Sequence, residues 1–197
     1  MNTRIRRTKF NVSLLGESTV GKTTMIHKYL GNSMKTSSLA TIGIDNITDK
    51  VQFDGQDYVF KIYDTAGQEK YRSLTTSIIK VNEGFLLVFA VNNQNSFDRI
   101  NYWIKELADK VTLEDKVIYL VGNKIDEPDR IIDYQVAAKF AEENDMKYFE
   151  TSAKTGVGIK EVFKNLYEEV YNKNKSAVPT NVKLVDKKPQ KGGGCCK

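Results

Sequence analysis

Residues 9–24 read KFNVSLLGESTVGKTT, and this stretch decides the fold. Its first part, Lys9 to Leu15, is an apolar run typical of a buried strand. Gly16 ends that run, and a helical pattern extends from Lys22 to about Leu30. A strand, a Gly-rich loop and a helix in this order predict the opening unit of an α/β domain.

Strand and helix patterns alternate along the rest of the chain. Further strands are predicted at 46–53, 58–63, 85–91, 117–121 and 147–151, and further helices at 96–110, 134–144 and 159–171. The continuous runs FLLVFAV (85–91) and VIYLV (117–121) are typical of parallel strands buried on both faces. Asp54-Gly55 predicts a hairpin turn, which adds one antiparallel edge strand. We therefore expect a doubly wound α/β fold with a mostly parallel six-stranded sheet and helices on both faces.

Charge is unevenly placed along the 197 residues. The net charge is +5, and residues 172–197 hold seven Lys and one Asp, so this segment is +6 and residues 1–171 carry 23 − 24 = −1. A body without a cationic face argues against nucleic-acid binding, whereas a cationic tail suits an anionic membrane surface. Alternatively, the lysines only keep a linker soluble. We expect a domain at 1–171 and a flexible tail at 172–197, too poor in apolar residues to fold. Neither a membrane-spanning run nor a signal peptide is expected.

Residues 16–23 fit the phosphate-loop pattern G-x-x-x-x-G-K-[ST] in the required place between strand and helix. Backbone N–H groups and the helix N-terminus can cradle phosphate oxygens there. Lys22 would reach the β and γ phosphates, and Thr23 would hold Mg²⁺. The pattern alone does not separate ATP from GTP. The candidate nucleotide contacts in this loop are Gly16, Glu17, Ser18, Thr19, Val20, Gly21, Lys22, Thr23 and Thr24.

The hexapeptide DTAGQE at 64–69 follows the third predicted strand. An acidic residue at that point, Asp64, can hold Mg²⁺ through water, and Gly67 can bring a backbone N–H to the γ-phosphate. Gln68 is neutral and has both a donor and an acceptor, which suits it to orient a water molecule for in-line attack.

Two later motifs also follow strands, at the sheet edge where doubly wound folds bind ligands. In NKID (123–126), Asp126 can accept two hydrogen bonds from guanine N1 and N2, which adenine cannot supply. In TSAK (151–154), the Ala153 N–H is placed to meet the guanine oxygen. The candidate guanine contacts are Asn123, Lys124, Asp126, Ser152, Ala153 and Lys154.

GESTVGKT, Thr41, DTAGQE, NKID and ETSAK together resemble the Ras superfamily across residues 10–171, the whole predicted domain. The resemblance implies a P-loop G domain that binds GTP or GDP with Mg²⁺ and hydrolyses GTP slowly. It implies that Thr41 binds Mg²⁺ and senses the γ-phosphate, with Lys22, Gly67 and Gln68 as its catalytic partners. Ser18, the TIGID segment at 41–45 and a double-cysteine end are most similar to Rab proteins. Met34 stands where an aromatic residue normally covers the guanine edge.

Cys195 and Cys196 are adjacent, so a disulfide bond between them could not stabilise the fold, and their spacing matches no zinc-ligand pattern. Their resemblance to Rab proteins implies two geranylgeranyl groups and a membrane tether. The implied partners are effectors that read the switch loops, an exchange factor, a GTPase-activating protein, the prenylation machinery and a lipid-extracting chaperone. The implied location is the cytoplasmic face of intracellular membranes, with a cytosolic pool and a role in vesicle traffic.

Two other function classes stay open at this point. A P-loop ATPase or kinase is disfavoured by NKID at 123–126 but shares the phosphate loop. A nucleotide-holding module with little turnover is kept open by Thr19, Met34 and Ser38, which replace more usual residues near the nucleotide. Hydrolysis measured in a single turnover would separate the second alternative from an active GTPase.

Overall fold

A computed structural model describes residues 8–31, 44–65 and 72–176. Its strands are β1 (Lys9–Leu15), β2 (Ile44–Phe53), β3 (Gln56–Thr65), β4 (Gly84–Ala90), β5 (Val117–Asn123) and β6 (Lys147–Thr151). Its helices are α1 (Lys22–Tyr29), α2 (Arg72–Val81), α3 (Gln94–Asp98), α4 (Ile100–Ala108), α5 (Tyr134–Glu143) and α6 (Ile159–Ser176), with a short 3-10 turn, η2 (Leu113–Asp115).

The six strands form one sheet in the order β2-β3-β1-β4-β5-β6. Strand β1 lies in the middle and pairs in parallel with β3 on one side and β4 on the other. The chain turns to one side after β1 and to the other side after β3, so the topological switch point lies at β1. The loop that follows β1 therefore opens at the sheet edge where such folds bind ligands. The predicted doubly wound fold is confirmed.

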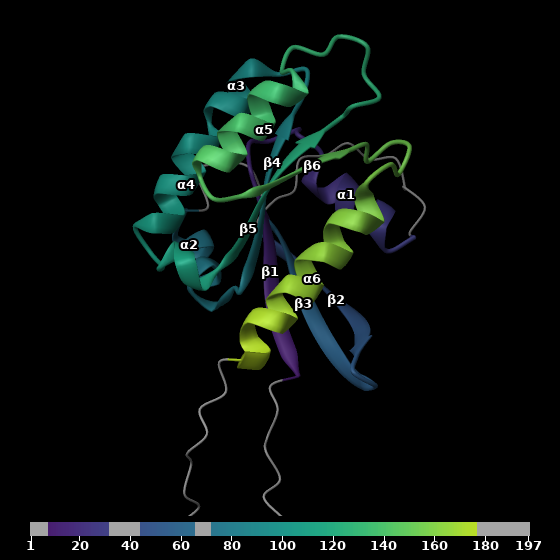
Figure 1. Ribbon diagram of the computed structural model, residues 1–197, viewed down its shortest axis with the longest axis vertical. Coiled ribbons are helices and arrows are strands. Elements are labelled where there is room, and N and C mark those ends of the chain that lie inside the picture. Colours follow the sequence, from purple (N-terminus) through teal and green to yellow (C-terminus); the bar gives the residue numbers. More distant parts are fainter. Residues whose placement is uncertain (1–7, 32–43, 66–71, 177–197) are drawn as a thin grey trace, which may run out of the picture.

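Helices cover both faces of the sheet (Figure 1). One core joins the sheet to α1 and α6, through residues such as Met25, Phe163 and Tyr167. The other core joins it to α2, α3, α4 and α5, where Ile79 and Trp103 are buried. Strand β4 is buried along its whole length because helices lie over both of its faces.

Strands β2 and β3 form the predicted hairpin, with β2 at the edge of the sheet. Asp54 and Gly55 both adopt positive φ angles, 49° and 73°, as a two-residue type I′ turn requires. The helix predicted at 96–110 appears as α3 and α4, which meet at Arg99 without leaving helical backbone angles. Helix α2 was not predicted. Helix α6 runs to Ser176, beyond its predicted end at residue 171, so residues 172–176 are helical and not part of a flexible tail as expected. Among the described residues, no helix is long and apolar enough to cross a membrane.

Candidate nucleotide-binding site

The loop after β1 turns sharply because two of its residues are glycines in conformations that side chains rarely adopt. Gly16 has φ +144°, and a Cβ atom there would meet the Val88 carbonyl oxygen at 2.1 Å. Gly21 has φ +101°, and a Cβ atom there would meet Asn123 Nδ2 at 2.4 Å. The loop can therefore lie tightly over β4 and β5 only with glycine at both positions.

The side chain of Lys22 lies inside the loop and binds its backbone. Its side chain is 5% exposed, and its Nζ donates to the carbonyl oxygens of Gly16 and Glu17 at 2.8 Å each. Burial lowers the pKa of Lys22 to about 8, against the opposing attraction of Asp64 and Glu17. A buried ammonium group held inside a backbone loop suits a phosphate ligand, which would supply the missing negative charge.

The first turn of α1 adds backbone donors at the same place. Gly21 precedes this helix, no side chain caps its N-terminus, and its first turn contains no acidic residue. The first N–H groups of any helix have no partner within that helix, and the helix dipole favours an anion there. The loop, Lys22 and the α1 N-terminus thus converge at one place, which makes this place a candidate phosphate site.

Thr23 and Asp64 meet beside this loop. Strands β1 and β3 pair with Leu14 opposite Asp64, which brings the carboxylate next to the start of α1. Thr23 Oγ1 donates to Asp64 Oδ2 at 2.6 Å, and Asp64 is 2% exposed. A hydroxyl and a carboxylate are the hard oxygen ligands that Mg²⁺ prefers, so the pair fits the predicted magnesium site.

Asp126 faces the other half of the site with an ionised carboxylate. Its Oδ1 accepts a hydrogen bond from Ser152 Oγ at 2.5 Å, and this bond is the main cause that lowers the pKa of Asp126. Its Oδ2 is buried without a hydrogen-bond partner among the described residues, although Lys154 Nζ lies 3.5 Å away. A buried acceptor oxygen needs a hydrogen-bond donor, and a guanine N–H group could supply one.

Asn123 has a structural role that its motif did not reveal. It is 1% exposed, and its Nδ2 donates to the Val20 carbonyl oxygen at 2.8 Å. Its Oδ1 accepts from Ala153 N at 3.0 Å and from Thr151 Oγ1 at 3.1 Å. Asn123, a predicted guanine contact, therefore also connects the phosphate loop to the loop after β6 through its hydrogen bonds.

Two supporting contacts were missed in the sequence because their partners lie far apart in the chain. Arg99 Nε donates to Glu17 Oε1 at 3.2 Å, which ties the phosphate loop to the start of α4. Lys28 Nζ donates to the Lys154 carbonyl oxygen at 3.2 Å, which ties α1 to the loop after β6. No local pattern signals either pairing.

The structure brings most of the predicted contacts to one edge of the sheet. Val20 and Ala153 are buried, Ser18 and Thr24 are half-buried, and Thr19 is exposed with a positive φ of 66°. Lys124 is half-buried and also has a positive φ, 68°. The remaining predicted site residues lie outside the described residues: Met34, Thr41, Gly67, Gln68, Cys195 and Cys196.

This geometry defines a P-loop nucleotide-binding protein with a carboxylate suited to guanine. The sequence profile of the Ras family matches residues 11–172. The chain is 34% identical over 192 residues to Ras-related protein Rab-18-B of Danio rerio, which covers 95% of this chain and 94% of that protein. It is also 34% identical over 188 residues to Ras-related protein Rab-44 of Homo sapiens, but it spans 18% of that longer protein.

The chain belongs to the Ras family and is a Rab-like small GTPase. It is a molecular switch that binds GTP or GDP with Mg²⁺ and hydrolyses GTP. Family membership thus decides among the P-loop enzymes in favour of a GTPase. Regulators and effectors in general follow from the same membership.

Proposed function

We propose that this GTPase holds its nucleotide through the residues gathered at the sheet edge. The backbone of residues 16–24 and Lys22 bind the phosphates, Thr23 and Asp64 hold Mg²⁺, and Asp126 selects guanine. The observation that carries this assignment is Asp126, whose buried Oδ2 has no hydrogen-bond partner among the described residues and makes only a 3.5 Å ion-pair contact with Lys154 Nζ. Bound Mg²⁺ would neutralise phosphate charge during hydrolysis. Ser152 supports the assignment because its hydroxyl keeps Asp126 ionised and oriented.

We propose that the remaining site residues form the switch. Thr41 and Gly67 sense the γ-phosphate, Gln68 orients the attacking water, and Met34 covers the guanine edge more loosely than an aromatic ring would. No Arg occurs between residues 31 and 44, so that segment supplies no arginine to stabilise the transition state. Hydrolysis is therefore slow until a GTPase-activating protein binds, and an exchange factor restarts the cycle.

We also propose a role in vesicle traffic at the cytoplasmic face of intracellular membranes, with a cytosolic pool. The named relatives are Rab proteins, and Cys195 and Cys196 end a segment with seven Lys and one Asp. In this proposal residues 1–171 are the G domain and 172–197 are the tail, although residues 172–176 form the end of α6. The prenylation machinery attaches lipid to both cysteines, and a lipid-extracting chaperone maintains the cytosolic pool.

Single-turnover hydrolysis tests the enzymatic part of this proposal. The purified chain is loaded with GTP or ATP, and phosphate release is followed after addition of Mg²⁺. We expect slow hydrolysis of GTP, none of ATP, and a further loss in Gln68→Leu. A wild-type rate in Gln68→Leu would contradict the role of Gln68. Tight GTP binding with no hydrolysis, even with an activating protein, would favour the nucleotide-holding module.

A further inference from the structure

Lys28 connects the end of α1 to the loop after β6. It is the last residue but one of α1, its side chain is exposed, and its Nζ donates to the Lys154 carbonyl oxygen at 3.2 Å. The stem of Lys28 also lies close to Gly156, because a Cβ atom at Gly156 would meet Lys28 Cε at 2.8 Å. Lys28 therefore contacts the backbone of this loop at two positions.

Hydrogen bonds within the loop lead from Lys154 to Asp126. Gly156 N donates to the Ser152 carbonyl oxygen at 2.7 Å, and Thr155 N donates to Ser152 Oγ at 3.0 Å. The same Ser152 hydroxyl donates to Asp126 Oδ1 at 2.5 Å. Lys154 lies between the bonded ends of this loop. A displacement of Lys154 would therefore reach the Asp126 carboxylate through Ser152.

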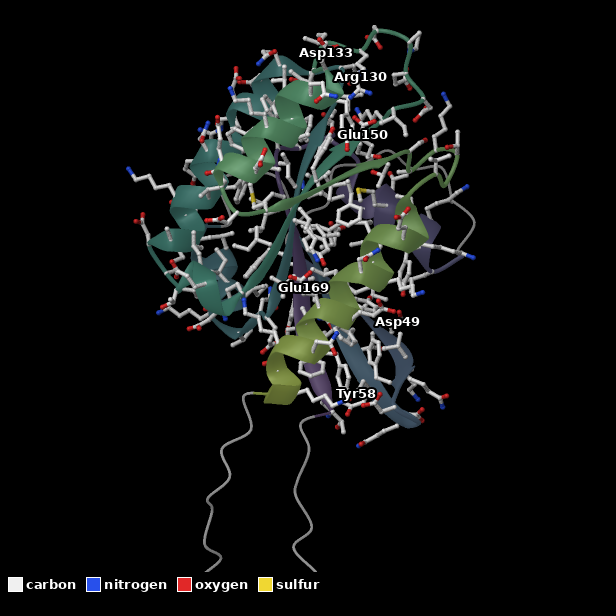
Figure 2. All side chains as sticks on the ribbon, viewed as in Figure 1. Asp49, Tyr58, Arg130, Asp133, Glu150 and Glu169 are labelled. Carbon is white, nitrogen blue, oxygen red and sulfur yellow. The ribbon has the colours of Figure 1, made fainter. Side chains whose placement is uncertain are left out.

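The elements on either side of the loop are held independently of Lys28. Helix α1 is fixed against α6, since Tyr29 stacks on Phe163 with ring centroids 4.3 Å apart. Strand β6 pairs with β5, and its residue Glu150 forms an ion pair with Arg130 (Figure 2). Loss of the Lys28 ammonium is therefore expected to affect the loop rather than the helix or the strand.

A pocket lies beside the loop where Lys28 reaches it. Its volume is about 430 Å³, and it is lined by Lys28, by Thr155, Gly156 and Gly158 of the loop, and by the first residues of α6. Open space therefore replaces packed side chains on this side of the loop. Where packing contributes little, a hydrogen bond from α1 contributes more to the position of the loop.

We propose that Lys28 is a positioning residue for base recognition. Its hydrogen bond to Lys154 keeps the loop after β6 in place, and through Ser152 it keeps Asp126 aligned with guanine. The inference rests on the proposed selection of guanine by Asp126. Hydrogen bonds to a carboxylate weaken when their geometry is lost, so a displaced loop weakens the base contacts and leaves the proposed phosphate contacts intact. The effect should be equal for GDP and GTP, which carry the same base.

Nucleotide release from Lys28→Met tests this proposal, with fluorescent GDP and inosine diphosphate labelled on the ribose. Inosine lacks the N2 amine, so Asp126 can accept one hydrogen bond from it instead of two. We expect GDP release to accelerate about fivefold and inosine diphosphate release about twofold at most. A non-hydrolysable GTP analogue should show the same acceleration as GDP. Lys28→Arg keeps a donor and should restore the wild-type rates.

Lys173→Met is a matched control. Lys173 is also exposed, and its Nζ donates to the Lys116 carbonyl oxygen at 2.8 Å, just before β5 and away from the candidate site. Its removal should leave both release rates unchanged. Equal acceleration for the two bases in Lys28→Met, no acceleration, or no recovery in Lys28→Arg would overturn the inference. A wild-type chain that releases GDP as fast as inosine diphosphate would instead refute the proposed role of Asp126.

Discussion

The side chain of Asn123 joins the two halves of the nucleotide site, because its Nδ2 donates to the Val20 carbonyl oxygen at 2.8 Å. Its other amide atom, Oδ1, accepts from Ala153 N at 3.0 Å. The phosphate loop and the guanine loop come from opposite ends of the domain sequence. One buried carboxamide therefore sets the distance between the loop proposed to hold phosphate and the loop proposed to hold the base.

Asn123→Ala should loosen both halves at once. The change leaves the buried Val20 carbonyl and the Ala153 N–H without their partner, which costs about 1–3 kcal/mol of the free energy of unfolding for each group. We expect GDP release at least tenfold faster and a lower melting temperature. Thr151→Val is the control, since it removes only the 3.1 Å bond to Asn123 Oδ1. If GDP release from Asn123→Ala were no faster than from Thr151→Val, the proposed role of Asn123 in connecting the two loops would be refuted.

Asp126→Asn should change which base is bound. An amide in place of the carboxylate offers a donor, which matches the oxygen that xanthine carries where guanine has an amine. We expect weaker GTP binding and tighter binding of xanthosine triphosphate, measured by competition against a fluorescent nucleotide. Glu127→Gln is a neighbouring control, because Glu127 contacts Lys154 at 3.7 Å but is not predicted to face the base. An unchanged preference for guanine in Asp126→Asn would contradict the assignment.

Local patterns predicted the residues whose role depends on neighbours in the chain. The run from Lys9 to Leu15 and the two loop glycines specify a strand and a tight turn by themselves, and the structure confirms both. Helix α2 was missed because its sequence, RSLTTSIIKV, is rich in β-branched residues that favour strands. Burial of Ile79 against the sheet overrides that preference.

Contacts between distant residues could not be predicted in the same way. Glu17 and Arg99 are 82 positions apart, and nothing near either residue indicates its partner. Asp126 was predicted from its motif, but the buried hydroxyl of Ser152 that orients it became evident only in the folded arrangement. The chemistry of the site could thus be predicted from its motifs, whereas the contacts that support it depend on the packing of the whole domain.

The affinity for GDP should fall as the pH rises above about 8. Burial lowers the pKa of Lys22 to about 8 in the free protein, and bound phosphates would raise it again by favouring the ammonium form. Below this pH, Lys22 of the nucleotide-free protein is already protonated. Above it, Lys22 must take up a proton when GDP binds. Calorimetry in two buffers of different ionisation enthalpy, at about pH 8.5, should detect that uptake. Lys22→Arg keeps its charge and should show none. Absence of uptake in the wild type would contradict the argument.

Loss of both terminal cysteines should release the protein from membranes. Cys195 and Cys196 follow a segment whose lysines include Lys183, Lys187, Lys188 and Lys191. One lipid chain gives marginal, reversible binding, while two chains, or one chain with a basic segment, give a stable anchor. Each lysine near an anionic leaflet adds up to about 1 kcal/mol of binding free energy. We therefore expect Cys195→Ser with Cys196→Ser to be cytosolic, whereas either single variant should stay on the membrane through one lipid chain and the basic segment. Mass spectrometry of the native C-terminal peptide should show two prenyl groups. Replacement of the four lysines by Gln, with both cysteines kept, should weaken membrane binding without abolishing it. Unmodified thiols on protein recovered from membranes would overturn the lipid anchor.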